Sequence, residues 1–335
     1  MIVRATSDLH LTQKTAPLVF AALDELRADA EAHGGVTVLA GDLLDQPYTA
    51  HMPIWDRLRE LLWGWPGEVY IIPGNHDMHD QEAGRHVLGG LAHQHRVKVI
   101  SVPVSTKIGV MVPYIHPKRD FAAALKSGMS ARPMDHRVDV LWMHQGVRGA
   151  YMNRMVRDTT GLLSGDLPMW TTISGHYHCP QNMGPLIYCG SPYQTSFAEE
   201  GQQKGWLRWD DITEETVPKR IGFEFETPLH YTLDWARERP LEAPDAVRPG
   251  VDRVRVRTAM TRTEAASRMD ELRDLGIEGA QVLYSDLGQL ATEIEQDTAP
   301  RQAAAMYIMA TMATDVARPD PAAMLEFAQE EGLWE

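Results

Sequence analysis

Five stretches of the chain share one pattern, in which a short apolar run is followed directly by polar residues with ligating side chains. The runs are rich in β-branched residues, and their length suits buried strands. The stretches span residues 2–10, 36–42, 69–77, 138–144 and 170–178. We predict that each begins with a strand and ends in a loop that carries chemistry.

Two segments between the first three strands have the spacing of amphipathic helices. In 17–33 apolar residues recur at intervals of three and four from Val19 to Ala30, and Gly34 follows the segment. Residues 52–63 form the second candidate. Alternating strands and helices favour parallel β-α-β units, whose ligand sites form beyond the carboxyl ends of the strands. We therefore expect the five polar clusters to meet at one rim.

The composition changes near residue 221. The segment 218–249 holds five prolines, which favours a boundary between domains. We place a main domain at 1–220, a smaller domain at 221–285 and a helical C-terminal segment at 286–335. Within the smaller domain the pattern predicts a strand, a helix and a strand, at 251–258, 262–275 and 280–284.

The bulk composition is that of a globular protein. Of 335 residues 44% are hydrophobic and 23% charged, and no apolar run approaches the roughly 18 residues of a membrane span. We see no secretory signal, and two cysteines favour a reducing, cytoplasmic location over a disulfide framework. The net charge is −14, yet the last fifty residues hold ten acidic and two basic side chains. The remainder is close enough to neutral that charge does not exclude a phosphate-rich polymer as a partner.

The polar clusters supply seven candidate metal ligands. They are Asp8, His10, Asp42, Asn75, His144, His176 and His178. Imidazole, carboxylate and amide groups suit Mn²⁺, Fe or Zn²⁺ better than Mg²⁺ or Ca²⁺. Two ions close together need a bridging ligand, and Asp42 is the natural bridge because a carboxylate offers two oxygens. We expect the neighbouring Gly41 to leave room for the ions.

Three further residues complete the candidate site. His76 follows Asn75 directly, so its side chain should diverge from the ligand and face substrate, where it could protonate a leaving alkoxide. Asp45 and Asp77 are candidate carboxylates that orient imidazoles. Each motif alone is typical of a surface histidine or a turn, but five such clusters in this order argue against coincidence.

Two groups of arginines are candidate DNA contacts. Arg253, Arg255 and Arg257 alternate with valines and would share one face of a strand. The alternative is a solvated face paired with acids. Arg148, Arg154 and Arg157 follow His144 in a loop near the rim and form the second group.

The motifs resemble those of the calcineurin-like metallophosphoesterases. The residues that carry the resemblance are Asp8-Leu9-His10, Gly41-Asp42-Leu43-Leu44-Asp45, Gly74-Asn75-His76-Asp77, His144 and Gly175-His176-Tyr177-His178. Two later segments, 190–197 from Gly-Ser-Pro onward and 199–205 with Glu199, Glu200 and Lys204, are similar to the SbcD-like branch, the nuclease subunits of DNA repair and recombination complexes. The resemblance implies a four-layer α/β/β/α sandwich with a small β-α-β capping domain. Thr12 departs from the family, where glycine is common.

The resemblance also implies roles for the candidate residues. One ion would be held by Asp8, His10, Asp42 and His178, and the other by Asp42, Asn75, His144 and His176. His76 would be the catalytic histidine outside the ligand set. The implied activity is Mn²⁺-dependent hydrolysis of DNA phosphodiester bonds, exonucleolytic or endonucleolytic. The implied partner is an SbcC-like SMC/ABC-type ATPase.

The C-terminal segment has two interpretations. An apolar stripe from Ala305 to Val316 would either pack on its own domain or dock on the ATPase. The sequence leaves a homodimer open and gives no reason to expect a membrane partner.

Two other functions compete with the nuclease. A phosphodiesterase or phosphatase acting on nucleotides or other small molecules could use the same scaffold. A non-catalytic scaffold subunit is the third hypothesis, but such chains usually lose ligands, whereas every expected ligand and His76 are present here.

Overall fold

The computed structural model describes residues 1–284 apart from 49–50, 131–138, 154–155 and 214–215. The chain divides into two compact units, Met1–His230 and a second that begins at Tyr231. The first unit extends past residue 221 because the carboxylate of Glu25 accepts hydrogen bonds from the backbone amides of Glu224 and Phe225. The predicted helical segment 286–335 and its apolar stripe lie outside the described residues.

The first sheet of the first unit contains three of the predicted strands. Its strand order is β14-β13-β1-β2-β3-β6. The strands are β1 Val3–Thr6, β2 Val36–Ala40, β3 Glu68–Ile72, β6 Val97–Val99, β13 Trp206–Trp209 and β14 Lys219–Ile221. β1, β2 and β3 are parallel neighbours, and they are connected through α1 Ala16–His33 and α2 Met52–Trp63. The predicted β-α-β units are therefore confirmed.

The other two predicted strands lie in a second sheet. Its order is β11-β12-β10-β9-β8-β7. The strands are β7 Val104–Thr106, β8 Gly109–Met111, β9 Val140–His144, β10 Thr171–Gly175, β11 Gln181–Met183 and β12 Leu186–Tyr188. β9 and β10 pair in parallel, with Gly175 opposite His144. The ligand-bearing strands thus belong to two sheets.

The two sheets pack face to face through alternate residues of their strands. A buried cluster joins Val36 and Val38 of β2 to Trp142 of β9 and Ile173 of β10. Trp142 also meets Trp209 of β13, with ring centroids 5.5 Å apart. Because successive side chains of a strand point to opposite faces, the remaining residues of these strands face outward.

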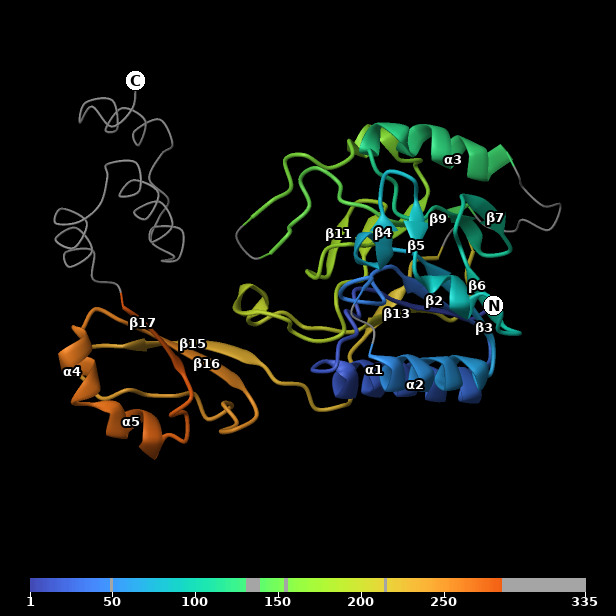
Figure 1. The fold of residues 1–335 in the computed structure, drawn as a ribbon. Helices are drawn as coiled ribbons and strands as arrows, with labels where there is room; N and C mark the ends of the chain where they lie inside the picture. The colour runs from blue at the N-terminus through green and yellow to red at the C-terminus, as the bar shows by residue number, and fades with distance from the viewer. Residues whose placement is uncertain (49–50, 131–138, 154–155, 214–215, 285–335) are drawn as a thin grey trace, which may run out of the picture. The chain divides into compact units, whose positions relative to one another are not determined.

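Helices cover both outward faces. α1 and α2 pack on the first sheet in a cluster with Leu39, Ile71 and Trp206. α3, Phe121–Ser130, packs on the second sheet in a cluster with Leu141 and Met143. Figure 1 shows α1 and α2 on one side of this unit and α3 on the other. The continuous apolar runs follow from this burial on both faces.

Local sequence sets the ends of α1. Pro17 stands in its first turn, where a missing backbone N–H costs nothing. Gly34 ends the helix with a φ of 65°, and its N–H bonds the carbonyl of Ala30. The helix thereby returns the chain to the edge of the sheet where β1 begins, and β2 starts there with Val36 opposite Val3 and again ends at the rim.

The remaining regular elements of the first unit are short. β4, Met78–Asp80, and β5, Arg85–His86, form a hairpin after the Asn75 motif. In the part of this unit that the structure describes, the 3₁₀ turns are η1 Asn75–Asp77, η2 Leu88–Leu91, η3 Lys118–Asp120, η4 Ser164–Asp166 and η5 Phe197–Glu199. Among the residues that the structure describes, no helix is long and apolar enough to cross a membrane.

The second unit has a three-stranded sheet of order β15-β16-β17. The strands are β15 His230–Trp235, β16 Arg253–Thr258 and β17 Gln281–Tyr284, and β16 pairs with β17 in parallel as the β-α-β prediction requires. β15 was not predicted. The expected helix 262–275 is two helices, α4 Arg262–Ala266 and α5 Met269–Asp274.

The break between α4 and α5 has one local and one tertiary cause. The Ser267 hydroxyl donates to the carbonyl of Glu264, which competes with the helical backbone pattern. The Arg268 guanidinium then reaches three carbonyls of another segment, those of Ala236, Arg237 and Arg239. Tertiary contacts therefore override the helical periodicity at this point.

Candidate metal centre

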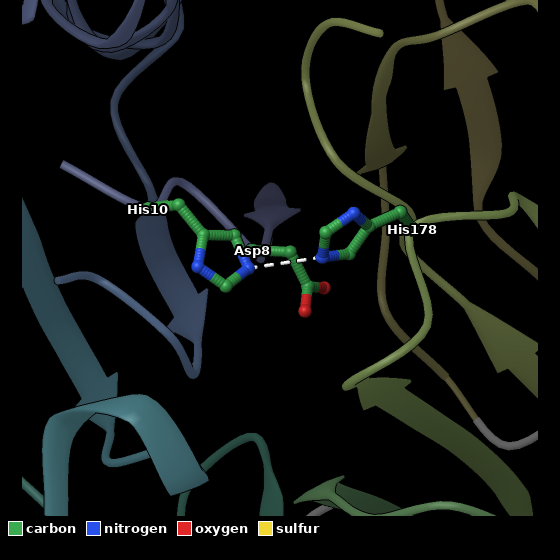
Figure 2. A group of neighbouring side chains, drawn as sticks. All are labelled: Asp8, His10 and His178. Atoms are coloured by element: carbon green, nitrogen blue, oxygen red, sulfur yellow. Dashed lines mark hydrogen bonds between the residues drawn. The ribbon is translucent and has the colours of Figure 1, made fainter. Parts of the chain in front are cut away.

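The ends of the five ligand-bearing strands meet at one place, although they belong to two sheets. Three overlapping groups have potential ligand atoms within 4.8 Å of one another. They are Asp8, His10 and His178; His10, Asp42 and His76; and Asp42, His144 and His176. Figure 2 shows the first group, with His10 and His178 facing each other across Asp8. Asn75 joins the third group through its Oδ1, 2.8 Å from Nδ1 of His176.

The backbone is unusual at the same residues. Among the described non-glycine residues φ is positive at four, all of them candidate ligands: Asp8 (54°), His10 (46°), Asp42 (51°) and His176 (90°). This region costs L-residues roughly 1 kcal/mol or more each, so the surrounding structure must impose it. Such strain clusters at functional sites.

Backbone hydrogen bonds hold these turns in register. The loops after β1 and β2 run side by side, since the amides of Asp8 and His10 donate to the carbonyls of Gly41 and Asp42, both at 3.0 Å. The amide of His176 donates to the Asp8 carboxylate at 3.1 Å. Both sheets therefore contribute to a single fixed arrangement.

Gly41 is required for a reason that differs from the prediction. A Cβ at this position would lie 1.9 Å from Nδ1 of His144, and its φ is 96°. The glycine therefore makes room for an imidazole from the opposite sheet.

Asp42 is the most central acid of the site. Its Oδ1 accepts from the amide of His76 at 2.8 Å, and its Oδ2 lies 3.1 Å from Nε2 of His144 and 3.9 Å from Nε2 of His10. Burial alone would raise the pKa of Asp42, but the imidazoles of His144 and His10 outweigh burial and hold it well below its ordinary value. Asp42 is therefore an ionised carboxylate shared by two of the three groups.

His144 brings an imidazole nitrogen to within 3.1 Å of the Asp42 carboxylate. Its Nδ1 lies 2.8 Å from the carbonyl of Ala40 and donates to it, which leaves Nε2 toward Asp42. Nε2 and the Asp42 oxygen lie in contact without hydrogen-bond geometry. Burial would lower the pKa of His144, yet the Asp42 carboxylate raises it to about 9. The two atoms are therefore placed so that a proton, or an ion that takes nitrogen and oxygen ligands, would fit between them.

His176 stays neutral near pH 7. Burial, followed by the neighbouring His144, lowers its pKa to about 4. A neutral imidazole is the form that binds metals. The buried histidines, carboxylates and amide oxygen therefore fit divalent ions, as the donor set predicts.

His76 lies at the exposed side of the cluster. Its Nδ1 lies 2.6 Å from the carbonyl of Asp45, and its ring packs edge-on against His10 with centroids 4.7 Å apart. It diverges from Asn75 as expected. Its membership in one ligating group also places it within reach of the centre.

The two carboxylates expected to orient imidazoles differ in what they contact. Asp45 Oδ1 lies 3.4 Å from Nδ1 of His10, close to the imidazole but without a hydrogen bond to it. The Asp77 carboxylate instead accepts from the backbone amides of Leu43 (3.3 Å), Leu44 (2.9 Å) and Gly74 (2.9 Å). Burial and the Asp42 charge raise the pKa of Asp77 to about 7. Asp77 thus ties the Asp42 loop to the Asn75 loop through backbone amides rather than through an imidazole.

Two of the candidate DNA-contact arginines near the rim, Arg148 and Arg157, lie in the loop that follows β9. Arg157 stacks on the ring of Tyr151 at 3.9 Å and donates to its hydroxyl and to the carbonyl of Gly149. Arg148 is exposed, and Arg154 lies outside the described residues. These contacts hold Arg157 within its own loop.

Of the three candidate arginines of β16, two contact side chains of β15 and one is exposed. Arg255 donates to the hydroxyl of Thr232 at 2.8 Å, and Arg257 pairs with Asp234 at 3.2 Å. Arg253 is exposed. Arg257 therefore pairs with an acid, as the alternative expects, whereas the contact of Arg255 is with a hydroxyl.

Sequence reasoning missed the groups that support the ligands. Glu199 and Lys204 surround His178, and they appeared above only as residues that carry a resemblance. Tyr177, between two ligands, donates to Asp158 at 2.5 Å, and Asp158 also accepts from the amides of Thr160 and Gly161. No spacing rule identifies such partners, because they are distant in the sequence.

No family model matches the chain, and no curated protein matches it. Among solved structures the chain is similar to Yfce, a phosphoesterase from E. coli, with 16% identity and a TM-score of 0.30, over 67% of this chain and 100% of that one. At this TM-score the likeness supports no conclusion about fold or activity.

Proposed function

We propose that this chain is a two-metal phosphodiesterase that hydrolyses DNA, the nuclease subunit of an SbcCD-like repair or recombination complex. The observation that carries the metal centre is the shared position of Asp42 between two groups of ligating atoms. The packing of α1 and α2, two sheets and α3 would then be the four-layer sandwich of the calcineurin-like enzymes. The second unit would be the capping domain.

The proposed ligand set starts from the first and third groups and adds Asp42 to the first, because its Oδ2 lies 3.9 Å from Nε2 of His10. Asp8, His10, Asp42 and His178 would hold one ion. Asp42, Asn75, His144 and His176 would hold the other. Because nitrogen ligands are prominent, we propose Mn²⁺, with Fe or Zn²⁺ also compatible and Mg²⁺ weaker.

Each part of the site has a role in phosphodiester cleavage. Bound divalent ions supply a water of lowered pKa and neutralise charge on the phosphoryl oxygens. His76 lies beside the ligands and on the exposed side, so it would donate a proton to the departing sugar oxygen. The carbonyl of Asp45 fixes its ring by accepting from Nδ1, which directs Nε2 away from that anchor.

DNA as substrate rests on the Gly190–Gln194 segment and on the presence of a second unit with an exposed Arg253. The ATPase partner rests on the same resemblance. A nucleotide or small-molecule diester remains the competing substrate class, and the experiment below separates the two.

The test uses the full chain with Mn²⁺ and end-labelled linear duplex DNA, beside bis(p-nitrophenyl) phosphate and a nucleotide. We expect Mn²⁺-dependent DNA cleavage that falls about 10²- to 10⁴-fold in His76→Ala while Mn²⁺ binding persists. His95→Ala, which removes an exposed histidine outside the cluster, is the matched control. Turnover of only the small substrates would replace the nuclease with the general phosphodiesterase, and wild-type rates in His76→Ala would remove its catalytic role.

A further inference from the structure

A buried polar cluster lies against the Nδ1 side of His178 and belongs to none of the proposed ligands. Its central residues are Glu199, which is 4% exposed, and Lys204, whose side chain is 8% exposed. Buried charges of this kind are expensive unless they are paired. Their position beside a candidate ligand therefore needs an explanation.

The contacts of Glu199 all come from donors. Its Oε1 lies 2.9 Å from Nδ1 of His178 and also accepts from the Thr195 hydroxyl. Its Oε2 accepts from the Thr195 amide at 3.1 Å and lies 2.7 Å from Nζ of Lys204. Since a carboxylate paired with an ammonium only accepts hydrogen bonds, His178 must be the donor in its contact with Glu199.

The direction of that bond fixes the tautomer of His178. With the proton on Nδ1, the lone pair of a neutral imidazole lies on Nε2. This atom is 2.9 Å from Nε2 of His10, in the group that includes Asp8. The ring thus presents its lone pair to the other ligands of the proposed first ion.

His144 is oriented in the same manner by a different acceptor. Its Nδ1 donates to the backbone carbonyl of Ala40, which no substitution can remove. For His178 the acceptor is a side chain. The two ions can therefore be distinguished experimentally, because a change at Glu199 reaches only one of them.

We propose that Glu199 is a positioning residue that sets His178 as an Nε2 ligand, and that Lys204 compensates its buried charge. The inference rests on the proposed function, since it takes His178 as a metal ligand. Lys204 also donates to the carbonyl of His178 at 2.7 Å, so the pair holds both the ring and the backbone of this residue. Outer-shell partners of this kind typically contribute 10- to 100-fold to metal affinity.

The test is Glu199→Gln in the full chain, with Mn²⁺ binding measured by calorimetry and electron paramagnetic resonance. Glutamine keeps the shape but introduces an amide NH₂, which must face either His178 or the Lys204 ammonium. We expect one of two Mn²⁺ ions to bind 10- to 100-fold more weakly and the other to bind unchanged. Glu60→Gln, the same change on the exposed face of α2, is the control.

A second readout follows the imidazole itself. In protein with ¹⁵N-labelled histidine, the ring nitrogens of His178, assigned by comparison with His178→Gln, should show the Nδ1–H tautomer in the metal-free wild type. Glu199→Gln should reduce that population. Glu199→Asp keeps the charge for Lys204 but withdraws the carboxylate from His178, so it should reproduce the selective loss even if the glutamine variant fails to fold.

Two results would overturn the role of Glu199. One is wild-type affinity for both ions in Glu199→Gln. The other is equal loss of both ions together with a lower melting temperature of the metal-free protein, which would indicate a structural role alone. A wild-type chain that binds no Mn²⁺ would instead overturn the proposed function, and with it the ligand role of His178.

Discussion

At the scale of single residues, the centre depends on how closely the two sheets approach at Gly41. The space that a Cβ would occupy is filled by the ring of His144, and the ring in turn faces Asp42. The absence of a side chain at Gly41 therefore permits both the positive φ at this position and the close packing of the His144 ring. Each contribution can be measured separately.

Gly41→Ala is expected to destabilise the protein and to abolish Mn²⁺ binding. The new Cβ must displace His144, and the φ of 96° adds strain of about 1 kcal/mol. Gly84→Ala is the control, because Gly84 has a φ of 63° but nothing within 4 Å of a new Cβ. Urea unfolding should show a loss of about 1 kcal/mol for Gly84→Ala and a larger loss for Gly41→Ala; equal losses would mean that the His144 contact has no effect.

Individual residues also show which contacts of the site could not be predicted from the sequence. Asp8, Asp42 and His176 could be identified because each follows an apolar run directly. Asp77 was predicted to orient an imidazole, but its carboxylate accepts from three backbone amides. Sequence spacing does not distinguish these two kinds of partner. Glu199 could not be assigned a role, because its contact with His178 depends on a turn whose geometry no periodicity encodes.

At the scale of elements, strands buried on both faces were the easiest to predict. β2 and β9 lie between two apolar layers, so their residues form continuous runs. β15 has a mixed pattern, with exposed and half-buried residues among buried ones, and its position at the edge of a three-stranded sheet depends on β16. Edge strands of this kind carry a weak local signal.

Glu271 is expected to stabilise the second unit in a pH-dependent way. Its carboxylate accepts from Arg268, from Nε1 of Trp235 and from the amide of Leu241. The Arg268 guanidinium, ahead of the other donors, lowers the pKa of Glu271 to about 2 from an ordinary 4.5. Because the folded pKa is depressed, the stabilisation is present above pH 4.5 and is lost as the pH falls toward 2.

Glu271→Gln tests this linkage. At pH 7 the variant should expose the segment around Trp235 and Leu241 to faster hydrogen exchange, with a loss on the order of 1 kcal/mol. The difference between variant and wild type should shrink as the pH is lowered toward 2. Glu278→Gln, a change at an exposed residue of the same unit, is the control; a difference that is independent of pH would contradict the assignment.

At the scale of the whole molecule, the proposed ions should stabilise the first unit. Ligands that bind only the folded chain add about 2.7 kcal/mol per site at a hundredfold excess over the dissociation constant. For a unit of this size we expect the melting temperature to rise by about 5 °C or more with Mn²⁺ and to return with EDTA. Ca²⁺, which prefers oxygen ligands, should have a smaller effect, and a melting temperature indifferent to Mn²⁺ would count against the centre.

Removal of the second unit should distinguish DNA from a small diester as the substrate. A chain that ends at His230 retains the compact first unit and every proposed ligand. If the second unit contacts DNA, this truncation should weaken DNA binding at least about tenfold and flatten its dependence on salt. Turnover of a small diester should change little; equal losses on both substrates would remove the capping role.

The positive φ angles of four candidate ligands also bear on the order in which the proposed centre would assemble. A denatured chain seldom places Asp8, His10, Asp42 and His176 in that conformation together, because each residue resists it. Only the completed pair of sheets can hold all four, so ions have no prepared site before the chain has folded. Mn²⁺ should then slow unfolding while leaving the refolding rate unchanged, and metal loading becomes a final step that can be repeated without rebuilding the protein.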